Sequence, residues 1–142
     1  MGRQRSTHGC RTRRPTGDTG SAVVDFALVG GLVTLMFVGV IQLAVVLHVR
    51  NTLVDCASEG ARYGGLADRS PAQGAARTRE LIALSLSSRY AEDVTAGSTL
   101  VDGVPVVEVR VSAPLPVIGL LGPGSGISVA GHGVDEKRVD EG

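Results

Sequence analysis

Residues 21–49 form a long apolar stretch and read SAVVDFALVGGLVTLMFVGVIQLAVVLHV. Within it, residues 26–47 carry no charge, and only Thr34 and Gln42 are strongly polar. About 20 apolar residues are enough to cross a hydrocarbon core roughly 30 Å thick. A helix over the whole stretch is roughly 43 Å long, because each residue adds about 1.5 Å. We therefore predict a transmembrane helix at 21–49 that crosses a bilayer and projects from it.

The length of this stretch also separates it from a cleavable secretory signal. Such signals have an apolar region of about 7–15 residues, followed by a small-residue site of the A-x-A kind. No convincing site of that kind follows Leu47. The stretch is therefore predicted to anchor the protein in the membrane.

Charge is distributed unequally on the two sides of the predicted span. Residues 1–20 contain five arginines and one acid, Asp18, which is a local balance of +4. Residues 21–142 contain nine basic and thirteen acidic side chains, a balance of −4, although the formal net charge is zero. Arginine concentrated on one side of a span keeps that side cytoplasmic. We predict a cytoplasmic leader at 1–20 and a C-terminal part outside the cytoplasmic membrane.

The two cysteines fall on opposite sides of this span, Cys10 in the leader and Cys56 beyond the membrane. An intramolecular disulfide cannot cross a bilayer, so no disulfide framework is predicted. We interpret Cys56 as a small helix-packing residue. An intermolecular bridge between subunits is the alternative.

The helix is predicted to continue past the membrane as an extension at 50–67. Small and apolar residues recur there at three- and four-residue spacing, and Gly64-Gly65 can supply the left-handed residue that ends the helix. A second helix is predicted from Ser70, because the segment combines an N-cap serine, a proline at the first helical position and a capping-box Gln73. The predicted apolar face of that helix is Ala75, Ala76, Ile82, Ala83, Leu86 and Tyr90.

Strands are predicted in the last third of the chain. Asp102-Gly103 lies between apolar residues, which is typical of a tight hairpin. Val107, Val109 and Val111 then alternate with polar residues, so one face of that strand is expected to be buried.

The surrounding segments are assigned by composition. Pro105 indicates that its end of the strand lies at a sheet edge. The Pro- and Gly-rich residues 113–126 are predicted to form a loop, and Ile127–Val129 a short third strand. The charged tail at 135–142 is predicted to be disordered.

These elements predict an α+β fold, in which the long N-terminal transmembrane helix extends into a small outer domain at 68–134. That domain has one further helix and a short antiparallel sheet. Outside the membrane the only aromatic residues are Tyr63 and Tyr90. So small a core would fold marginally on its own, and we expect it to pack on the extended helix or on neighbouring subunits.

Catalysis is not supported by the distribution of reactive residues. His8, His48 and His132 have no metal-ligand spacing, and no nucleophile-elbow pattern surrounds a serine. The glycine-rich segment 122–126 lacks a phosphate-binding lysine, and no basic aromatic surface indicates nucleic-acid binding. We predict no enzyme activity, cofactor, metal, nucleic acid or small-molecule substrate. Glu59 and Arg62 have the spacing of a helical ion pair, with a solvated surface pair as the simpler interpretation.

Two short motifs flank the predicted span. Gly20-Ser-Ala-Val-Val-Asp-Phe26 precedes the uncharged stretch, and Arg50-Asn-Thr-Leu-Val-Asp-Cys-Ala-Ser-Glu-Gly-Ala-Arg-Tyr63 follows it. Together they resemble the TadE-like (TadE/TadG) family of pilin-like proteins, which belong to tight-adherence (Flp-type IV) pilus systems. The resemblance marks as family-motif residues Phe26, Asn51, Glu59, Gly60, Ala61, Arg62 and Tyr63.

The resemblance implies that a membrane aspartic prepilin peptidase cuts between Gly20 and Ser21. The family pattern has Glu at the position of Asp25, so the charge is kept on a side chain one methylene shorter. An acid in a membrane span needs a function or a partner. After cleavage, Asp25 would lie one turn from the new ammonium of Ser21 and could pair with it, in its own subunit or a neighbour's, as the assembly carboxylate. The alternative is that Asp25 lies in the hydrated headgroup zone.

The functional hypothesis is a minor pilin or pseudopilin, a processed single-pass subunit used in assembling a Tad pilus or a related secretion apparatus. Its expected partners are membrane lipid, the prepilin peptidase, other pilin-like subunits and the Tad assembly machinery. After processing, the protein would reach the cell surface or a pilus. The alternative is an unprocessed membrane-anchored envelope protein whose outer domain binds a partner.

Overall fold

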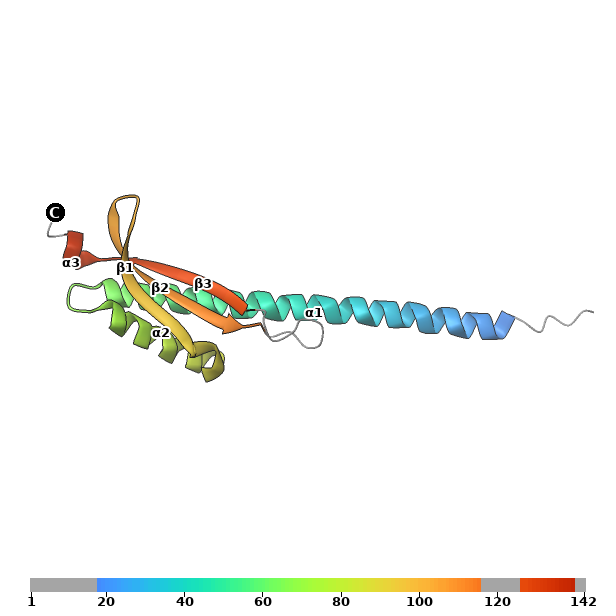
Figure 1. The fold of residues 1–142 in the computed structure, drawn as a ribbon. Helices are drawn as coiled ribbons and strands as arrows, with labels where there is room; N and C mark the ends of the chain where they lie inside the picture. Colours follow the sequence, from blue (N-terminus) through green and yellow to red (C-terminus); the bar gives the residue numbers. More distant parts are fainter. Residues whose placement is uncertain (1–17, 116–125, 140–142) are drawn as a thin grey trace, which may run out of the picture. The chain divides into compact units, whose positions relative to one another are not determined.

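The computed structural model describes residues 18–115 and 126–139. Their elements confirm the predicted α+β fold, with a long N-terminal helix, one further helix of several turns and a three-stranded antiparallel sheet (Figure 1). In chain order the elements are α1 (Asp18–Gly65), α2 (Pro71–Ser85), the short 3₁₀ helix η1 (Ser88–Ala91), β1 (Asp93–Val101), β2 (Val104–Pro114), β3 (Gly126–Val134) and α3 (Glu136–Val139).

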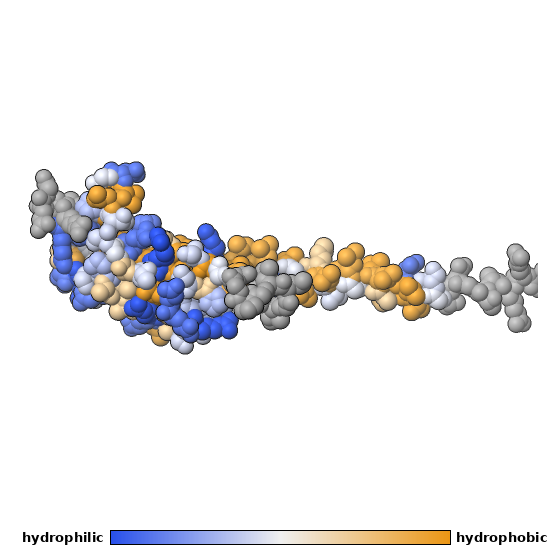
Figure 2. Space-filling model, viewed as in Figure 1, coloured by the Kyte–Doolittle hydropathy of each residue, from blue (hydrophilic) through white to orange (hydrophobic). Residues whose placement is uncertain are grey.

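The chain divides after Gly39 into two compact units. In the first, the described residues belong to α1, and those from Gly20 onward are exposed, Phe26 to 81%. The only strongly polar side chain between Phe26 and Gly39 is satisfied within the helix, because the Thr34 hydroxyl donates to the Gly30 carbonyl at 2.8 Å. The surface of this part of α1 is mainly apolar (Figure 2). Among the described residues, α1 is the one helix long and apolar enough to cross a membrane, which is consistent with a single-pass membrane protein.

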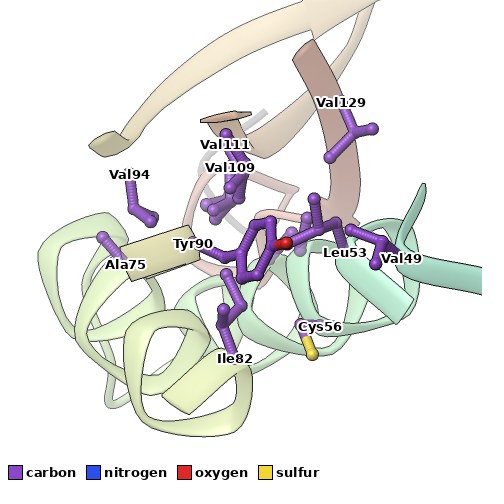
Figure 3. Packing of buried hydrophobic residues seen from close by; sticks show 14 residues of the cluster. Val49, Leu53, Cys56, Ala75, Ile82, Tyr90, Val94, Val109, Val111 and Val129 are labelled. Atoms are coloured by element: carbon purple, nitrogen blue, oxygen red, sulfur yellow. The ribbon is translucent and has the colours of Figure 1, made fainter. Parts of the chain in front are cut away.

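The core of the second unit lies between the sheet and the helices α1 and α2 (Figure 3). Leu53 of α1, Ile82 of α2 and Val109 of β2 are completely buried. Full burial of such side chains stabilises a fold by about 1.5–3 kcal/mol each. The expectation that the small domain packs on the extended helix is thus confirmed. Cys56 is also buried in this core, as predicted for a helix-packing residue.

Helix α2 begins as predicted. The Gln73 amide donates to the Ser70 hydroxyl at 3.4 Å, and the Ser70 amide donates to the Gln73 side chain at 3.0 Å, which completes the capping box. Its predicted apolar face is only partly correct. Ala76 and Ala83 are exposed, Tyr90 belongs to η1, and Thr78 is completely buried. The small interface is shared by two helices and the sheet. The short polar side chain of Thr78 is buried there, whereas Ala76, which was expected to be buried, is exposed.

The predicted hairpin is confirmed. Val101 pairs with Val104 across the turn, and Asp102 (φ 51°) and Gly103 (φ 81°) have the positive φ that two-residue hairpins with right-handed twist require. The valines at 107, 109 and 111 are completely buried, as their alternation predicted.

Strand β2 is the central strand, but its Pro105 end lies at an edge on the β3 side, as predicted. Pro105 pairs with Leu100 of β1, while pairing with β3 starts one residue later, at Val106. The Pro105 carbonyl accepts a hydrogen bond from the Asp135 amide at 3.0 Å. A proline is therefore tolerated in the central strand because it lies just outside the ladder to β3.

The chain after β2 departs further from the prediction. The third strand is longer than Ile127–Val129, and Ala113 and Pro114 belong to β2 rather than to a loop. The rest of the predicted loop, 116–125, lies outside the described residues. Disorder from residue 135 is wrong for 135–139, since Asp135 is buried and α3 follows it.

Gly64 and Gly65 end α1, but not by a left-handed residue: among the described residues only Asp102 and Gly103 have positive φ. Their role is close packing. A β-carbon at Gly64 would lie 3.2 Å from the Gly74 α-carbon, and one at Gly65 would collide with the Val134 carbonyl. The close neighbours at this end of α1 come from the start of α2 and from β3, which the local sequence does not show.

Candidate functional site

The predicted processing junction lies within a helix. Helix α1 begins at Asp18, so the bond between Gly20 and Ser21 falls in its first turn. Gly20 and Ser21 are exposed, and a β-carbon at Gly20 would meet nothing within 4 Å. A side chain at this position is therefore compatible with the fold.

Asp25 lies four residues after Ser21 on the same helix face. Side chains tilt toward the N-terminus of a helix, so the Asp25 carboxylate is directed toward the turn that contains Ser21. Within the described residues, Asp25 makes no hydrogen bond or ion pair, and both it and the neighbouring Phe26 are exposed. The carboxylate is free to pair with a cation placed at the start of the helix.

The second group of predicted site residues, Asn51 and residues 59–63, lies on α1 in the second unit. Gly60 and Ala61 are buried, whereas Asn51, Glu59 and Arg62 are exposed. Tyr63 is half-buried, and the Arg69 guanidinium lies over its ring at 4.9 Å from the centroid. The motif thus combines packing residues with surface residues.

Gly60 is required by the contact between α1 and α2. A β-carbon at Gly60 would collide with the Thr78 hydroxyl, and one at Gly74 would lie 2.6 Å from the Gly60 carbonyl oxygen. The buried Thr78 hydroxyl is within hydrogen-bond distance of the Gly74 carbonyl (3.0 Å) and the Cys56 carbonyl (3.4 Å). The two helices therefore approach backbone to backbone.

The sheet makes a similar contact with the backbone of α1 at Ala61, and this contact requires glycine in β3. A β-carbon at Gly133 would lie 2.5 Å from the Ala61 carbonyl oxygen, and one at Gly131 would collide with the backbone of Ala57. We call the set Gly60, Gly64, Gly74, Gly131 and Gly133 the glycine seam. Our sequence analysis missed its β3 members and Gly74. Glycines two residues apart in a strand share a face, and that spacing was the available signal.

Glu59 and Tyr63 line two open surface hollows. One, of about 490 Å³, is lined by Glu59, Arg62 and Tyr63 together with residues of β3 and α3. The other, of about 390 Å³, is lined by Glu59, Tyr63 and residues of α2. Of the two interpretations of Glu59 and Arg62, the solvated surface pair is the one found: both side chains are exposed, and no ion pair joins them in the described residues. The equally spaced Arg77 and Glu80 do form one, at 2.8 Å.

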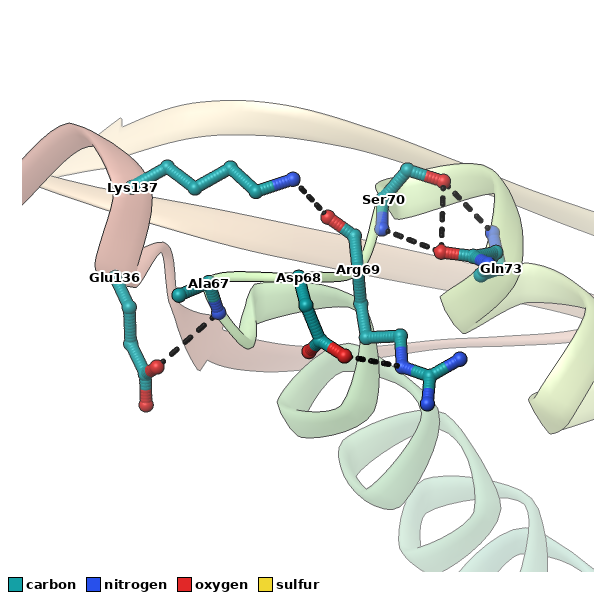
Figure 4. Close-up of polar contacts among 7 residues, drawn as sticks. All are labelled: Ala67, Asp68, Arg69, Ser70, Gln73, Glu136 and Lys137. Atoms are coloured by element: carbon teal, nitrogen blue, oxygen red, sulfur yellow. Dashed lines mark hydrogen bonds and ion pairs between the residues drawn. The ribbon is translucent and has the colours of Figure 1, made fainter.

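The loop between α1 and α2 is fixed by the segment after β3 (Figure 4). The Ala67 amide donates to the Glu136 carboxylate at 3.2 Å, and the Lys137 ammonium donates to the Arg69 carbonyl. Asp68 and Arg69 form an ion pair at 3.4 Å. These contacts hold Arg69 in place, with its guanidinium over the ring of Tyr63, a residue of the second motif.

The outer face of the sheet carries a second polar group, in which Glu108 contacts Arg110 at 2.8 Å and His132 at 3.1 Å. No group of three or more His, Cys, Asp or Glu side chains suited to a metal ion occurs in the described ranges.

The described residues thus combine one long apolar helix with a small α+β domain whose core includes residues 49–61 of that helix, which is consistent with a single-pass membrane protein. The sequence model of the TadE-like protein family matches residues 20–62, which include the junction, Asp25 and nearly all of the second motif. This match confirms the resemblance drawn from the two motifs. The TadE-like family is a pilus-associated structural family. No curated protein and no solved structure matches the chain.

Proposed function

We propose that this protein is a minor pilin or pseudopilin of a Tad (Flp-type IV) pilus or related secretion apparatus. The observation that carries the proposal is the family match over residues 20–62, which joins the junction, the apolar helix and the domain contacts in one segment. The prepilin peptidase removes residues 1–20, and the processed subunit associates with other pilin-like subunits and the assembly machinery.

Cleavage needs the first turn of α1 to open, because a protease takes its substrate as an extended chain. Helix ends fray readily, and glycine costs about 1 kcal/mol relative to alanine within a helix. Gly20 therefore favours the opened form next to the bond that is cut. Among the described residues, a β-carbon at Gly20 would meet nothing within 4 Å, so no packing there opposes this opening.

Cleavage also gives Asp25 a partner. The new α-amino group at Ser21 stands at the start of the shortened helix, one turn from the carboxylate. Pairing within a subunit neutralises both charges near the membrane surface, and pairing between neighbouring subunits makes the carboxylate an assembly contact. An acid in the first turn also interacts favourably with the helix dipole.

In the proposed topology the five arginines of residues 1–20 stay in the cytoplasm. The α+β domain is outside, where it meets other subunits. The alternative, an unprocessed membrane anchor whose domain binds an envelope partner, keeps the same topology and the full-length chain.

Intact mass separates these functions. The full-length protein is expressed with and without the prepilin peptidase and extracted from membranes. Loss of residues 1–20 only when the peptidase is present supports the proposal, and a full-length chain in both cases contradicts it.

Two glycine variants sharpen the experiment. Gly20→Leu should remain full length, because the leucine obstructs the peptidase. Gly30→Leu is the matched control, since a β-carbon at either position meets nothing within 4 Å, and it should be cut normally. Equal cleavage of both variants would contradict processing at Gly20.

A further inference from the structure

Strand β1 forms one edge of the sheet, and its second half is open to solvent. The strand order is β1-β2-β3, so β1 pairs with another strand on one side only. Its first half lies against α2, where Val94 is buried. Residues 97–101 are all exposed, and a β-carbon at Gly97 would meet nothing within 4 Å. The hairpin that β1 forms with β2 also continues past the end of β3 (Figure 1).

The register of the hairpin determines which backbone groups of β1 face outward. Val101 and Val104 flank the two-residue turn, and residues in these positions exchange hydrogen bonds with each other. Bonded and non-bonded pairs then alternate along the two strands. Every second residue of β1 therefore turns its amide and carbonyl away from β2. In the open half and next to it, these residues are Ala96, Ser98 and Leu100, and we call their outward amides and carbonyls the free edge groups.

Two contacts support this alternation. Val94 has the same parity as the free edge groups, and its carbonyl accepts a hydrogen bond from the Arg79 guanidinium at 2.5 Å, on the side away from β2. Pro105 of β2, in a non-bonded pair with β1, turns its carbonyl away from β1 and accepts from the Asp135 amide at 3.0 Å. In the described residues, no comparable contact reaches the free edge groups.

Strand β1 also lacks the features that usually protect an edge. Natural edge strands carry lysine, proline or a bulge, or they are covered by another element. After Asp93, β1 has no charged residue and no proline, and it pairs with β2 without a bulge. The other edge strand, β3, is partly shielded, because its backbone at Val134 lies directly against Gly65 of α1. Strand β1 is therefore the more accessible edge.

We propose that the open edge of β1 accepts an extended, uncharged segment of a partner subunit as a fourth strand of the sheet. This inference rests on the proposed function, which supplies the partner subunits. A row of alternating amides and carbonyls is complementary to an extended backbone, whose hydrogen bonds give affinity while the neighbouring side chains give selectivity. Leu100, which is 67% exposed, offers an apolar contact to a side chain of the added strand.

The direction of β1 argues against a second copy of this chain as the partner. Gly131 and Gly133 of β3 contact α1 at Ala57 and Ala61, so β3 runs in the same direction as α1. Strand β1 is parallel to β3, because each is antiparallel to β2. Antiparallel pairing of two β1 strands would direct the two α1 helices oppositely, whereas the proposed topology inserts every copy in the same direction. The added strand is therefore assigned to a different subunit.

Hydrogen exchange tests strand addition, because an added strand slows alternate amides of β1. The full-length protein in detergent is mixed with a synthetic peptide of sequence VVEVRVS, which repeats residues 106–112 of β2 and so suits pairing with β1. Exchange at Ala96, Ser98 and Leu100 should slow roughly threefold when the peptide is at about twice its Kd. Exchange at Gly97 and Thr99, whose amides already bond to β2, should not change.

The control is the same peptide with its backbone amides N-methylated, which cannot donate hydrogen bonds to the edge and should have no effect. Unchanged exchange with the unmodified peptide would overturn the proposal. Equal slowing at successive residues, or equal slowing with the methylated peptide, would also overturn it, because neither is expected from a paired strand.

A substitution at Ser98 tests the same edge during assembly. Ser98→Pro removes one outward amide and no bond to β2. Ser98→Ala is the matched control, since both variants lose the contact between the Ser98 hydroxyl and the Asp135 carboxylate at 3.3 Å. With the other subunits co-expressed, Ser98→Pro should lower recovery of crosslinked partner subunits roughly fivefold relative to Ser98→Ala, the scale of one hydrogen bond.

A second variant separates this effect from misfolding. Ser98→Lys places a charge at the edge without changing the backbone and should lower recovery in the same direction. Limited proteolysis checks the fold of each variant. Equal recovery from the proline, lysine and alanine variants would contradict strand addition at β1.

Failure of this contact is distinguishable from failure of the proposed function. A chain that loses its leader but shows no alternating protection of β1 remains a processed subunit and overturns only strand addition. A chain that shows this protection without losing its leader retains the edge site and overturns the processed role.

Discussion

The carbonyl oxygen of Ala61 lies 2.5 Å from the point that a β-carbon of Gly133 would occupy. The backbone of β3 therefore rests directly on the backbone of α1. Two motif residues make such backbone contacts: Gly60 contacts α2, and Ala61 contacts the sheet. The family motif thus holds the domain on the helix.

Gly133→Ala should destabilise the second unit by about 1–3 kcal/mol, the usual cost of overpacking, because its methyl group displaces either α1 or β3. Gly97→Ala is the matched control, since Gly97 also lies in a strand but a β-carbon there meets nothing within 4 Å. Its effect should stay within about 0.5 kcal/mol. Urea unfolding of the full-length protein in detergent measures both. Equal midpoints would contradict the close contact between α1 and β3.

Leu53→Ala should lower the free energy of unfolding by about 2–5 kcal/mol, because Leu53 is completely buried and its loss leaves a cavity. Leu84→Ala removes the same atoms from a side chain that is 76% exposed and should change it by less than about 0.5 kcal/mol. The ratio of the two losses in free energy of unfolding measures how much α1 contributes to the stability of the domain. Similar losses for both variants would mean that α1 is not part of the core.

Cys56 should react slowly with a maleimide in the folded protein, because its side chain is buried in the core. In a Cys10→Ser background, labelling in detergent should be roughly tenfold slower, or more, than labelling in concentrated urea. Mass spectrometry of samples taken over time gives both rates. Rapid labelling under native conditions would indicate that the helix extension and the domain separate in solution.

Asp25→Asn should weaken assembly of the processed protein by about 1 kcal/mol, roughly fivefold, because the amide cannot neutralise the Ser21 ammonium. Asp25→Glu keeps the charge and should assemble at least as well as the unchanged protein. Asp93→Asn, an exposed acid at the start of β1, is the control for loss of one negative charge. Recovery of crosslinked partner subunits from membranes reports assembly, and intact mass verifies that the leader has been removed from each variant. Normal assembly of Asp25→Asn would exclude a carboxylate contact.

The sequence predicts well those elements whose signals are short local patterns of residues. The uncharged stretch specifies the apolar half of α1, Ser70 and Gln73 specify the start of α2, and Asp102-Gly103 specifies the hairpin. Each signal lies within a few residues of the structure that it forms. The exposed and buried faces of β2 follow for the same reason, since alternation is a property of the strand itself.

The parts that could not be predicted depend on which elements meet. Ala76 is exposed and Thr78 buried because of where α2 crosses α1, and the helical periodicity of α2 alone fits either arrangement. Strand β2 is central because the three strands pair in chain order, and the sequence patterns do not show that β3 pairs on the free side of β2. Asp135 is in a charged segment, yet it is buried, and its carboxylate lies 3.3 Å from the Ser98 hydroxyl. The composition shows that the segment is charged, but it cannot show that Asp135 has a buried position next to Ser98.

The contact between Ala61 and Gly133 also determines when the domain can be completed. The two residues are separated by most of the outer domain, and contacts of such long sequence separation form late in folding. In the proposed topology, if the anchor enters the membrane first, α1 reaches the outer side with its Ala57–Ala61 face still uncovered. That face stays open until β3 has been translocated. The time that export takes between residue 61 and residue 133 is thus the time during which a chaperone or another subunit can reach the bare helix.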